Sequence, residues 1–345
     1  GLRPAEAGEF SRRAFENGKF DLTAAEGLAD LIEAETEAQR RQAQRQSRGE
    51  LGAMYDGWRG RMIRAQALTE TDIDFSDEDI PDDLIGEARE IASVLAAEIL
   101  KHLDDGHRGE RLRAGLYLAI IGPPNAGKSS LLNRLAKRDA AIVSDIAGTT
   151  RDVIDVHLAL GGYPVIAADT AGLREAGDSI ESEGVRRAQE RAEDADMKMV
   201  VFDATGLNSP EGLDPLTLSL IDADTLIVLN KAELVDGALP TEIADRPALA
   251  VSAKTGDGLD ELLDRIQQSA ANRLGSGDSP AVTRERHRKA LAQCSQSLAR
   301  ALKAQEAELM GEDLRLAARA LGSITGRVDV EDLLDVIFGE FCIGK

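Results

Sequence analysis

The residues with the clearest chemical potential in this chain form a short loop at positions 122–129, Gly-Pro-Pro-Asn-Ala-Gly-Lys-Ser. This pattern is typical of loops whose backbone N–H groups surround phosphate oxygens. Lys128 is expected to reach the β- and γ-phosphates of a nucleotide, and the Ser129 hydroxyl is expected to bind Mg²⁺. The other loop residues predicted to contact the nucleotide are Asn125, Ala126, Gly127 and Ser130.

The sequence on both sides of the loop fits the setting that this motif needs. The apolar run at 116–121 predicts a buried strand, and the pattern at 130–135 predicts a helix. A helix that begins at the loop brings the positive end of its dipole to the phosphates. The alternative, a chance glycine-rich turn, does not explain this strand–loop–helix order.

Three later stretches complete a pattern for binding a guanine nucleotide. Asp169-Thr-Ala-Gly172 ends a predicted strand; its carboxylate is expected to hold Mg²⁺ through water, and the Gly172 N–H to meet the γ-phosphate. The stretches 230–233 (Asn-Lys-Ala-Glu) and 252–254 (Ser-Ala-Lys) each follow another predicted strand. Together they are expected to surround the base through Asn230, Lys231, Glu233, Ser252, Ala253 and Lys254. Each stretch alone is common, but all four in this order predict binding of GTP and GDP.

Two residues, Glu233 and Leu173, depart from the usual pattern of a GTP-binding domain. Asn230 and the Ala253 N–H are expected to face the guanine O6 edge, and Glu233 to accept from N1 and N2, where an aspartate is usual. A charge-assisted hydrogen bond lost at Glu233 would cost about 1.5–3 kcal/mol. Leu173 stands where Ras-like enzymes carry a glutamine that orients the attacking water. Leucine can neither orient water nor supply positive charge, so other groups must do both.

The spacing of apolar residues divides the chain into helical and α/β parts. Helical spacing covers residues from about 22 to 68 and from about 84 to 103, with an acidic stretch at 72–81 between them, and it returns after a linker at 275–280. Between the helix that ends at about 103 and the linker at 275–280, short strands alternate with helices. Gly161-Gly162 predicts a hairpin turn there. The predicted strands are 116–121, 153–160, 165–168, 197–202, 225–229 and 249–251.

These patterns predict an α/β Ras-like P-loop GTPase domain inserted into an all-α helical domain. The predicted boundaries give a first helical part at 21–112, a GTPase domain at 113–275 and a second helical part at 276–345. The two helical flanks are expected to pack together, because neither has much core of its own.

Composition limits the class of partner and the location. The net charge is −21, which argues against a general nucleic-acid binder, because phosphate contacts need clustered Lys and Arg. RNA would therefore be met by a local basic patch or by a partner protein. No apolar run approaches the roughly 20 residues needed to cross a bilayer. The two cysteines fit a reducing compartment, so a cytoplasmic protein without membrane association is expected.

Several stretches together resemble the tRNA-modification GTPase MnmE (TrmE) family. They are Gly8–Phe15, Asp21–Glu26, Ser144–Asp152, Asp169–Arg174 and the final Phe341-Cys-Ile-Gly-Lys345. The resemblance covers essentially the whole chain, and related GTPases share the loop motifs but not these two ends. It implies that residues 1–20 are the tail of an N-terminal domain that binds a tetrahydrofolate derivative and forms a dimer. Most of that domain is expected to lie outside this sequence.

The resemblance implies a source of positive charge that fits Leu173. In the family a K⁺ ion takes the place of an arginine finger. By position, the side chain of Asn125 and the carbonyls of Ser144 and Ile146 would bind it. Two GTPase domains of a homodimer would meet across these loops when hydrolysis is poised.

The remaining catalytic roles are also implied by the resemblance. Thr150 would join Ser129 and Asp169 on Mg²⁺, with Thr149 beside it at the nucleotide, and Glu181 would position the attacking water. The enzyme would be a potassium-stimulated GTPase acting with the flavoprotein MnmG (GidA). Together they would install an aminomethyl-type group at C5 of the wobble uridine of tRNAs, with Cys342 as a reactive thiolate.

Simpler interpretations of several residues stay open. Asn125 could cap its loop, Glu181 could begin a solvated helix, and Cys342 could be inert. Cys294 is expected to be a packing residue. A run of arginines either faces solvent or touches tRNA or a partner: Arg40, Arg41, Arg45 and Arg48.

Two other functions compete with this one. A regulatory GTPase switch in ribosome assembly would need a basic RNA-binding module after the GTPase domain, where this chain has an acidic helical tail. A scaffold that binds GTP but barely hydrolyses it is the second. Hydrolysis rates in potassium and sodium salts separate the scaffold from the enzyme.

Overall fold

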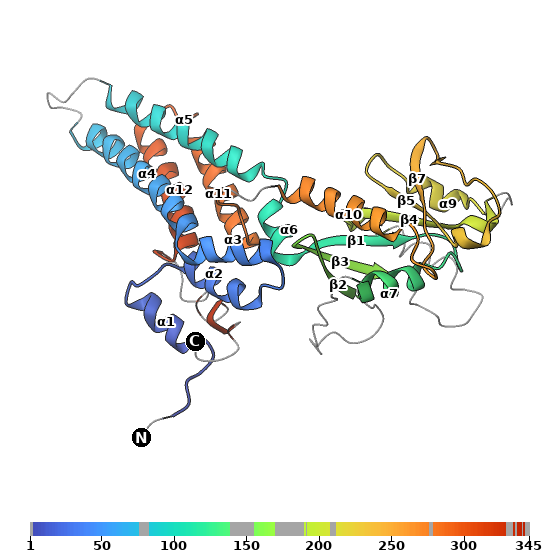
Figure 1. Ribbon diagram of the computed structural model, residues 1–345. Helices are drawn as coiled ribbons and strands as arrows, with labels where there is room; N and C mark the ends of the chain where they lie inside the picture. Colours follow the sequence, from blue (N-terminus) through green and yellow to red (C-terminus); the bar gives the residue numbers. More distant parts are fainter. Residues whose placement is uncertain are drawn as a thin grey trace, which may run out of the picture. The chain divides into compact units, whose positions relative to one another are not determined.

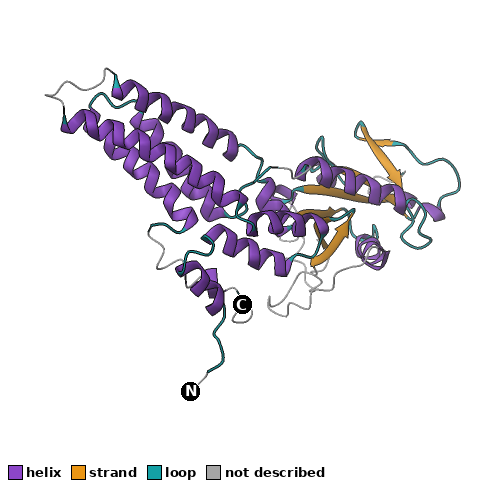
Figure 2. Ribbon diagram, turned by 60° about the vertical axis from the view of Figure 1, so that its left-hand side comes forward, coloured by secondary structure: helices purple, strands orange, loops and turns teal. Residues whose placement is uncertain are grey.

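The computed structural model describes residues 3–75, 83–138, 155–169, 190, 192–207, 212–275, 279–328, 334, 337–339 and 341. The chain separates into two compact units, one formed by Gly1–Arg113 with Ser276–Lys345 and the other by Ala114–Gly275. Helices build the first unit, and a sheet with helices builds the second (Figure 1, Figure 2). One continuous stretch therefore forms the α/β unit, and the two stretches that flank it form the helical unit.

The described part of the α/β unit contains a seven-stranded sheet. Its strands are β1 (Leu116–Ile121), β2 (Asp155–Leu160), β3 (Tyr163–Asp169), β4 (Met197–Asp203), β5 (Leu226–Asn230), β6 (Glu242–Ile243) and β7 (Arg246–Ala250). They are ordered β2-β3-β1-β4-β5-β7-β6. β2 is antiparallel to β3 and β6 to β7, while the other pairs are parallel. The carboxyl ends of β1, β3, β4, β5 and β7 therefore meet at one edge, where ligands bind in open α/β sheets.

The six predicted strands are confirmed with small shifts at their ends, the largest of which is in β7; the short edge strand β6 was not predicted. The apolar run predicted a strand at 249–251, but β7 covers Arg246–Ala250. Leu249 is buried, but Pro247 is exposed and Arg246 and Ala248 are only partly buried, so a search for apolar buried runs misses the start of this strand. Gly161 and Gly162 both have positive φ and form the predicted turn between β2 and β3.

The described part of the α/β unit also contains helices and short turns. They are α7 (Lys128–Arg138), η1 (Ala204–Gly206), α9 (Pro215–Ser219), η2 (Ala232–Leu234) and α10 (Leu259–Leu274). α10 buries residues at helical spacing, among them Leu262, Ile266 and Ala270.

The helical unit contains α1 (Glu9–Glu16), α2 (Leu22–Glu33), α3 (Glu37–Ser47), α4 (Glu50–Asp74), α5 (Leu84–Leu103), α6 (Arg108–Ala114), α11 (Glu285–Ala301) and α12 (Ala307–Thr325). The predicted helical run from 22 to 68 is thus divided into three helices. Thr36 and Gln39 form a capping box that starts α3, and Gly49, with φ 84°, precedes α4. The prediction of α5 is confirmed at both ends.

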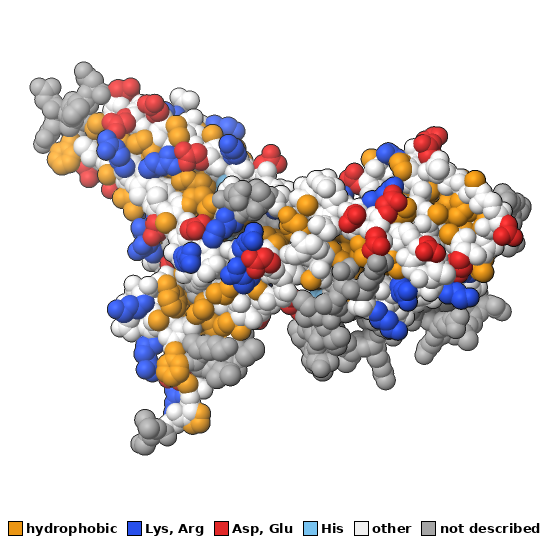
Figure 3. Space-filling view, viewed as in Figure 1, with side chains coloured by type: hydrophobic (Ala, Val, Ile, Leu, Met, Phe, Trp, Pro, Cys, Tyr) orange, Lys and Arg blue, Asp and Glu red, His pale blue; other side chains and the backbone are white. Residues whose placement is uncertain are grey.

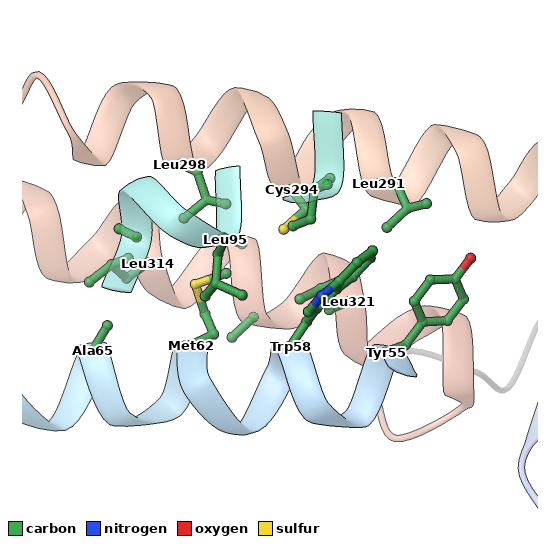
Figure 4. Packing of buried hydrophobic residues seen from close by; sticks show 14 of the residues in the cluster. Tyr55, Trp58, Met62, Ala65, Leu95, Leu291, Cys294, Leu298, Leu314 and Leu321 are labelled. Atoms are coloured by element: carbon green, nitrogen blue, oxygen red, sulfur yellow. The ribbon is translucent and has the colours of Figure 1, made fainter. Parts of the chain in front are cut away.

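The core of the helical unit lies between α4, α5, α11 and α12 (Figure 4). Met62 and Trp58 of α4 face Leu95 of α5, Leu298 of α11 and their neighbours across this core. Because α11 and α12 come from the second flank, the prediction that the two flanks pack together is confirmed. Cys294 is fully buried among these residues, so its expected packing role is confirmed as well.

A buried ionic cluster joins the two flanks beside this core. Glu26 of α2 is 1% exposed and accepts hydrogen bonds from Arg286 Nε (2.6 Å) and Nη2 (2.8 Å). His287 Nε2 lies 2.9 Å from the same carboxylate. Arg286 also donates to the Ile324 carbonyl near the end of α12 (3.1 Å). One carboxylate of the first flank therefore holds the guanidinium of Arg286 and the imidazole ring of His287, both from the second flank.

Acidification should destabilise the helical unit partly through His102. Burial lowers the pKa of His102 from 6.5 to about 4, although Asp105 opposes this shift. The unfolded chain takes up a proton near pH 6.5, while the folded chain resists it until about pH 4. The loss of folding stability from His102 is therefore absent above pH 6.5. It grows to about 1–3 kcal/mol as the pH falls from 6.5 to about 4.

Urea unfolding between these two pH values, followed by the fluorescence of Trp58, measures this effect. Trp58 is the chain's one tryptophan, and its ring lies 5.4 Å from the His102 ring. His102→Leu should reduce the loss of stability on acidification without abolishing it, because burial also lowers the pKa of His287. An unchanged loss in the variant would contradict the assignment to His102.

The surface of the helical unit mixes charges of both signs (Figure 3). Glu37 pairs with Arg40 (2.7 Å) and with Arg41 (2.8 Å) on the exposed side of α3. Two of the four arginines singled out in the sequence thus share one carboxylate of their own helix. No helix in the described ranges has the length and apolar character that crossing a membrane requires.

Candidate nucleotide-binding site

The loop at 122–129 connects β1 to α7 and takes a conformation that needs glycine. Gly122 has φ 149°, and a Cβ built there would lie 2.1 Å from the Val201 carbonyl oxygen of β4. Gly127 has φ 89°, and its Cβ would lie 2.2 Å from Asn230 Nδ2. Asn125 is exposed with φ 64°, a left-handed conformation that asparagine tolerates better than most residues. The loop therefore lies directly against the ends of β4 and β5.

Lys128, the first residue of α7, directs its ammonium group back over this loop. Its Nζ donates to the carbonyls of Gly122 (2.7 Å) and Pro123 (2.9 Å). The side chain is buried, whereas Ser129 and Ser130 in the same first turn are exposed. A positive charge and a helix N-terminus thus share the concave side of a glycine loop, an arrangement that suits phosphate.

Asn230, at the end of β5, links the phosphate loop to the loop at 252–254. Its Nδ2 donates to the Ala126 carbonyl (2.9 Å), and its Oδ1 accepts from the Ala253 N–H (3.1 Å). The side chain is 2% exposed. Sequence reasoning directed Asn230 and the Ala253 N–H at the guanine O6 edge, but here they bond to each other. Asn230 therefore acts first as the internal connection between the phosphate and base loops.

The other base-loop residues surround this connection. Glu233 is exposed within η2, and Lys254 is exposed one residue after Ala253. Ser252 is fully buried and fixes its own turn, since its Oγ accepts from the Thr255 N–H (2.9 Å). The contacts of Glu233 and Lys254 with a base stay predictions.

Lys231 has a partner that sequence reasoning missed. Its Nζ lies 2.6 Å from Oδ2 of Asp203, the last residue of β4. Asp203 belongs to no sequence motif, so the one sequence signal for its role at the site is its position at the end of a predicted strand. The register pairs it with Asn230 on the neighbouring strand.

Several predicted site residues cannot be placed. Outside the described residues lie Ser144, Ile146, Thr149, Thr150, Gly172, Leu173, Glu181 and Cys342. Asp169 is described as the end of β3, but its side chain is not. Over the described ranges no group of three or more His, Cys, Asp or Glu side chains is arranged to hold a metal. The Mg²⁺ and K⁺ sites therefore stay predictions.

The sheet and its loops define a class of protein. A glycine loop follows β1, and the two base loops follow β5 and β7 at the same edge of a mainly parallel sheet. The buried ammonium of Lys128 and the glycine cradle fit the phosphates of a nucleotide. This is the architecture of a Ras-like P-loop GTPase domain.

Comparison with known proteins identifies the family. The sequence model of the MnmE helical domain family matches residues 22–342. "tRNA modification GTPase MnmE" of Paramagnetospirillum magneticum is 57% identical over 345 residues, which cover 100% of this chain and 78% of that protein. The protein of the same name from Rickettsia conorii is 48% identical over 347 residues, again covering 100% and 78%. The chain therefore belongs to the MnmE family.

Solved structures similar to parts of this chain include those of Era and of a FeoB G domain. Era of Aquifex aeolicus bound to GDP·AlF4⁻ has a TM-score of 0.36 and 26% identity, covering 55% of this chain and 68% of Era. The G domain of the FeoB iron transporter of T. maritima has a TM-score of 0.31 and 21% identity, covering 45% and 98%.

Proposed function

We propose that this chain is a potassium-stimulated GTPase that acts with the flavoprotein MnmG (GidA) in the cytoplasm. The pair would install an aminomethyl-type group at C5 of the wobble uridine of tRNAs, with a tetrahydrofolate derivative as carbon donor. Membership of the MnmE family supports the tRNA role. The observation that carries the GTPase role is the direct linkage of the phosphate loop to both base loops through Asn230.

The proposal assigns each ion to a set of residues. Ser129, Thr150 and Asp169 would hold Mg²⁺, and Asn125, Ser144 and Ile146 would hold K⁺. When bound, K⁺ supplies the positive charge that offsets the charge developing on the transferred phosphoryl group. Lys128 adds a second positive charge from the phosphate loop.

The orientation of the attacking water is assigned to a residue that follows the stretch Asp169–Gly172. Leu173 cannot orient water, so the proposal gives this role to Glu181. The hydrolysis-competent form would be a homodimer in which two GTPase domains meet. Cys342 would provide a thiolate for the modification chemistry rather than for GTP hydrolysis.

Steady-state GTP hydrolysis in KCl and in NaCl of equal ionic strength tests the proposal. We expect hydrolysis to be at least about tenfold faster in KCl, because the ion stands in for a guanidinium that is worth more than this in related enzymes. Glu181→Ala should reduce the KCl rate by at least about tenfold, in the range of a lost catalytic base. Glu183→Ala, in the same segment, is the matched control and should retain the rate.

Slow and equal rates in both salts would instead favour a GTP-binding scaffold. The tRNA role is tested separately by analysing wobble uridines in a strain that carries Cys342→Ser. Intact modification, together with sedimentation of the protein with ribosomal subunits, would favour the ribosome-assembly alternative.

A further inference from the structure

Asp203 is fixed in place at the carboxyl end of β4, beside the base loop. Its Oδ1 accepts from the backbone N–H (3.0 Å) and the hydroxyl (2.7 Å) of Thr205. Its Oδ2 receives the ammonium of Lys231 at 2.6 Å. Partial burial raises the pKa of the Asp203 carboxyl, but the hydrogen bonds from Lys231 and Thr205 outweigh it and leave the pKa lowered. The carboxylate is therefore ionised and oriented before any nucleotide arrives.

Lys231, the partner of Asp203, has an unusual backbone conformation. Its φ is 64°, in the left-handed region that a lysine rarely adopts. Its side chain runs beside the phosphate loop, because a Cβ built on Gly127 would lie 3.9 Å from Lys231 Cε. The outer end of the methylene arm thus lies near Gly127 of the loop, and the ammonium group pairs with Asp203.

We propose that Asp203 is a positioning residue for nucleotide binding. It holds Lys231 so that the methylene arm forms one wall of the nucleoside pocket, between the phosphate loop and the base loop. This inference rests on the proposed binding of GTP and GDP. Without the carboxylate, the side chain of Lys231 can adopt other rotamers, and its backbone is no longer restrained at a positive φ. The nucleotide must then restore that order when it binds, which weakens the measured affinity.

The pair is placed to affect binding more than stability. Its two side chains are 32% and 27% exposed, and ion pairs so open to solvent contribute little to unfolding free energy. The same strand offers a matched pair at its other end. Lys198 of β4 pairs with Asp222 at 2.7 Å, and Asp222 also accepts from the Thr225 hydroxyl. That pair lies at the opposite end of β4 from Asn230.

Asp203→Ala and Asp222→Ala, compared with the wild-type chain, test the proposal. We expect Asp203→Ala to weaken binding of a fluorescent GDP analogue about tenfold, in line with the cost of ordering one long side chain and its backbone. The KM for GTP should rise by a similar factor while kcat falls less than about twofold, because the contact is made before and during the reaction alike. Asp222→Ala should bind the analogue like the wild-type chain.

A double-mutant cycle separates positioning from a merely structural role. Lys231→Met keeps most of the unbranched arm but removes the ammonium group, so adding Asp203→Ala to it should cause little further loss of affinity. Equal binding by Asp203→Ala and the wild-type chain, equal losses in Asp203→Ala and Asp222→Ala, or additive losses in the cycle would overturn the inference alone. Failure of the wild-type chain to bind the analogue would overturn the proposed function together with it.

Discussion

Replacing Glu26 by alanine should cost the helical unit about 3–5 kcal/mol, because removing one partner of a buried ion pair leaves the other charge uncompensated. Glu26 receives two hydrogen bonds from Arg286 and lies against His287, with almost no exposure to water. Arg286 would retain the carbonyl of Ile324 as a partner but lose its counterion. Urea unfolding followed by Trp58 fluorescence measures the loss, since this tryptophan packs in the core of the same unit.

Glu37→Ala is the matched control for this experiment. Glu37 also pairs with two arginines, but its side chain and theirs are largely exposed. Solvent and salt screen such pairs, so the unfolding midpoint should hardly change. Glu26→Gln, which keeps the shape but not the charge, should still be strongly destabilised. Equal, small effects of Glu26→Ala and Glu37→Ala would refute a clamping role for the buried cluster.

Asn230→Ala should weaken GDP binding by at least about 100-fold. The substitution leaves the Ala126 carbonyl and the Ala253 N–H without the partner that the structure gives them. Each unpaired group costs about 1–3 kcal/mol, so the two loops are expected to lose their joint arrangement in the free variant. The nucleotide must then restore it, and about 3 kcal/mol of binding free energy corresponds to a factor of about 100 in affinity. Fluorescence titration with a GDP analogue measures the change, and far-UV circular dichroism checks that the fold is retained.

Asn272→Ala provides the comparison for Asn230→Ala. Asn272 lies on α10 of the same unit, is exposed, and accepts a hydrogen bond only from Gln268 in the described contacts. It should bind GDP like the wild-type chain. Asn230→Asp should also bind weakly, because a carboxylate oxygen would face the Ala126 carbonyl. Full affinity in Asn230→Asp would mean that the linkage between the loops does not support the site.

The phosphate and base loops could be predicted because their chemistry constrains local sequence. Gly127 must be glycine where its Cβ would strike Asn230, and Lys128 must begin a helix at the end of a strand. Such requirements produce a fixed spacing that is visible in a single sequence. The same reasoning found α5 and most of the strands, whose buried faces give regular apolar patterns.

What escaped prediction depends on contacts between distant segments. Asp203 matters because the β4–β5 register sets it beside Asn230 and Lys231, and no local pattern encodes that register. Glu26 stood out only within a family-like stretch, while its partner Arg286 lies 260 residues further along the chain. The sequence suggested that the Ala253 N–H faces the base. Its hydrogen bond to Asn230 depends on how two separate loops meet, which the sequence does not reveal.

The interrupted order of the helical unit has a consequence for synthesis on the ribosome. α4 and α5 are complete by Leu103, but their core partners α11 and α12 begin only at Glu285 and Ala307. The apolar stripes of the first two helices, which include Met62 and Leu95, must wait for the whole α/β unit to be translated. At about 5–20 residues per second this delay lasts on the order of ten seconds or more. Nascent chains should therefore be most prone to aggregate, and most dependent on chaperones, during that interval.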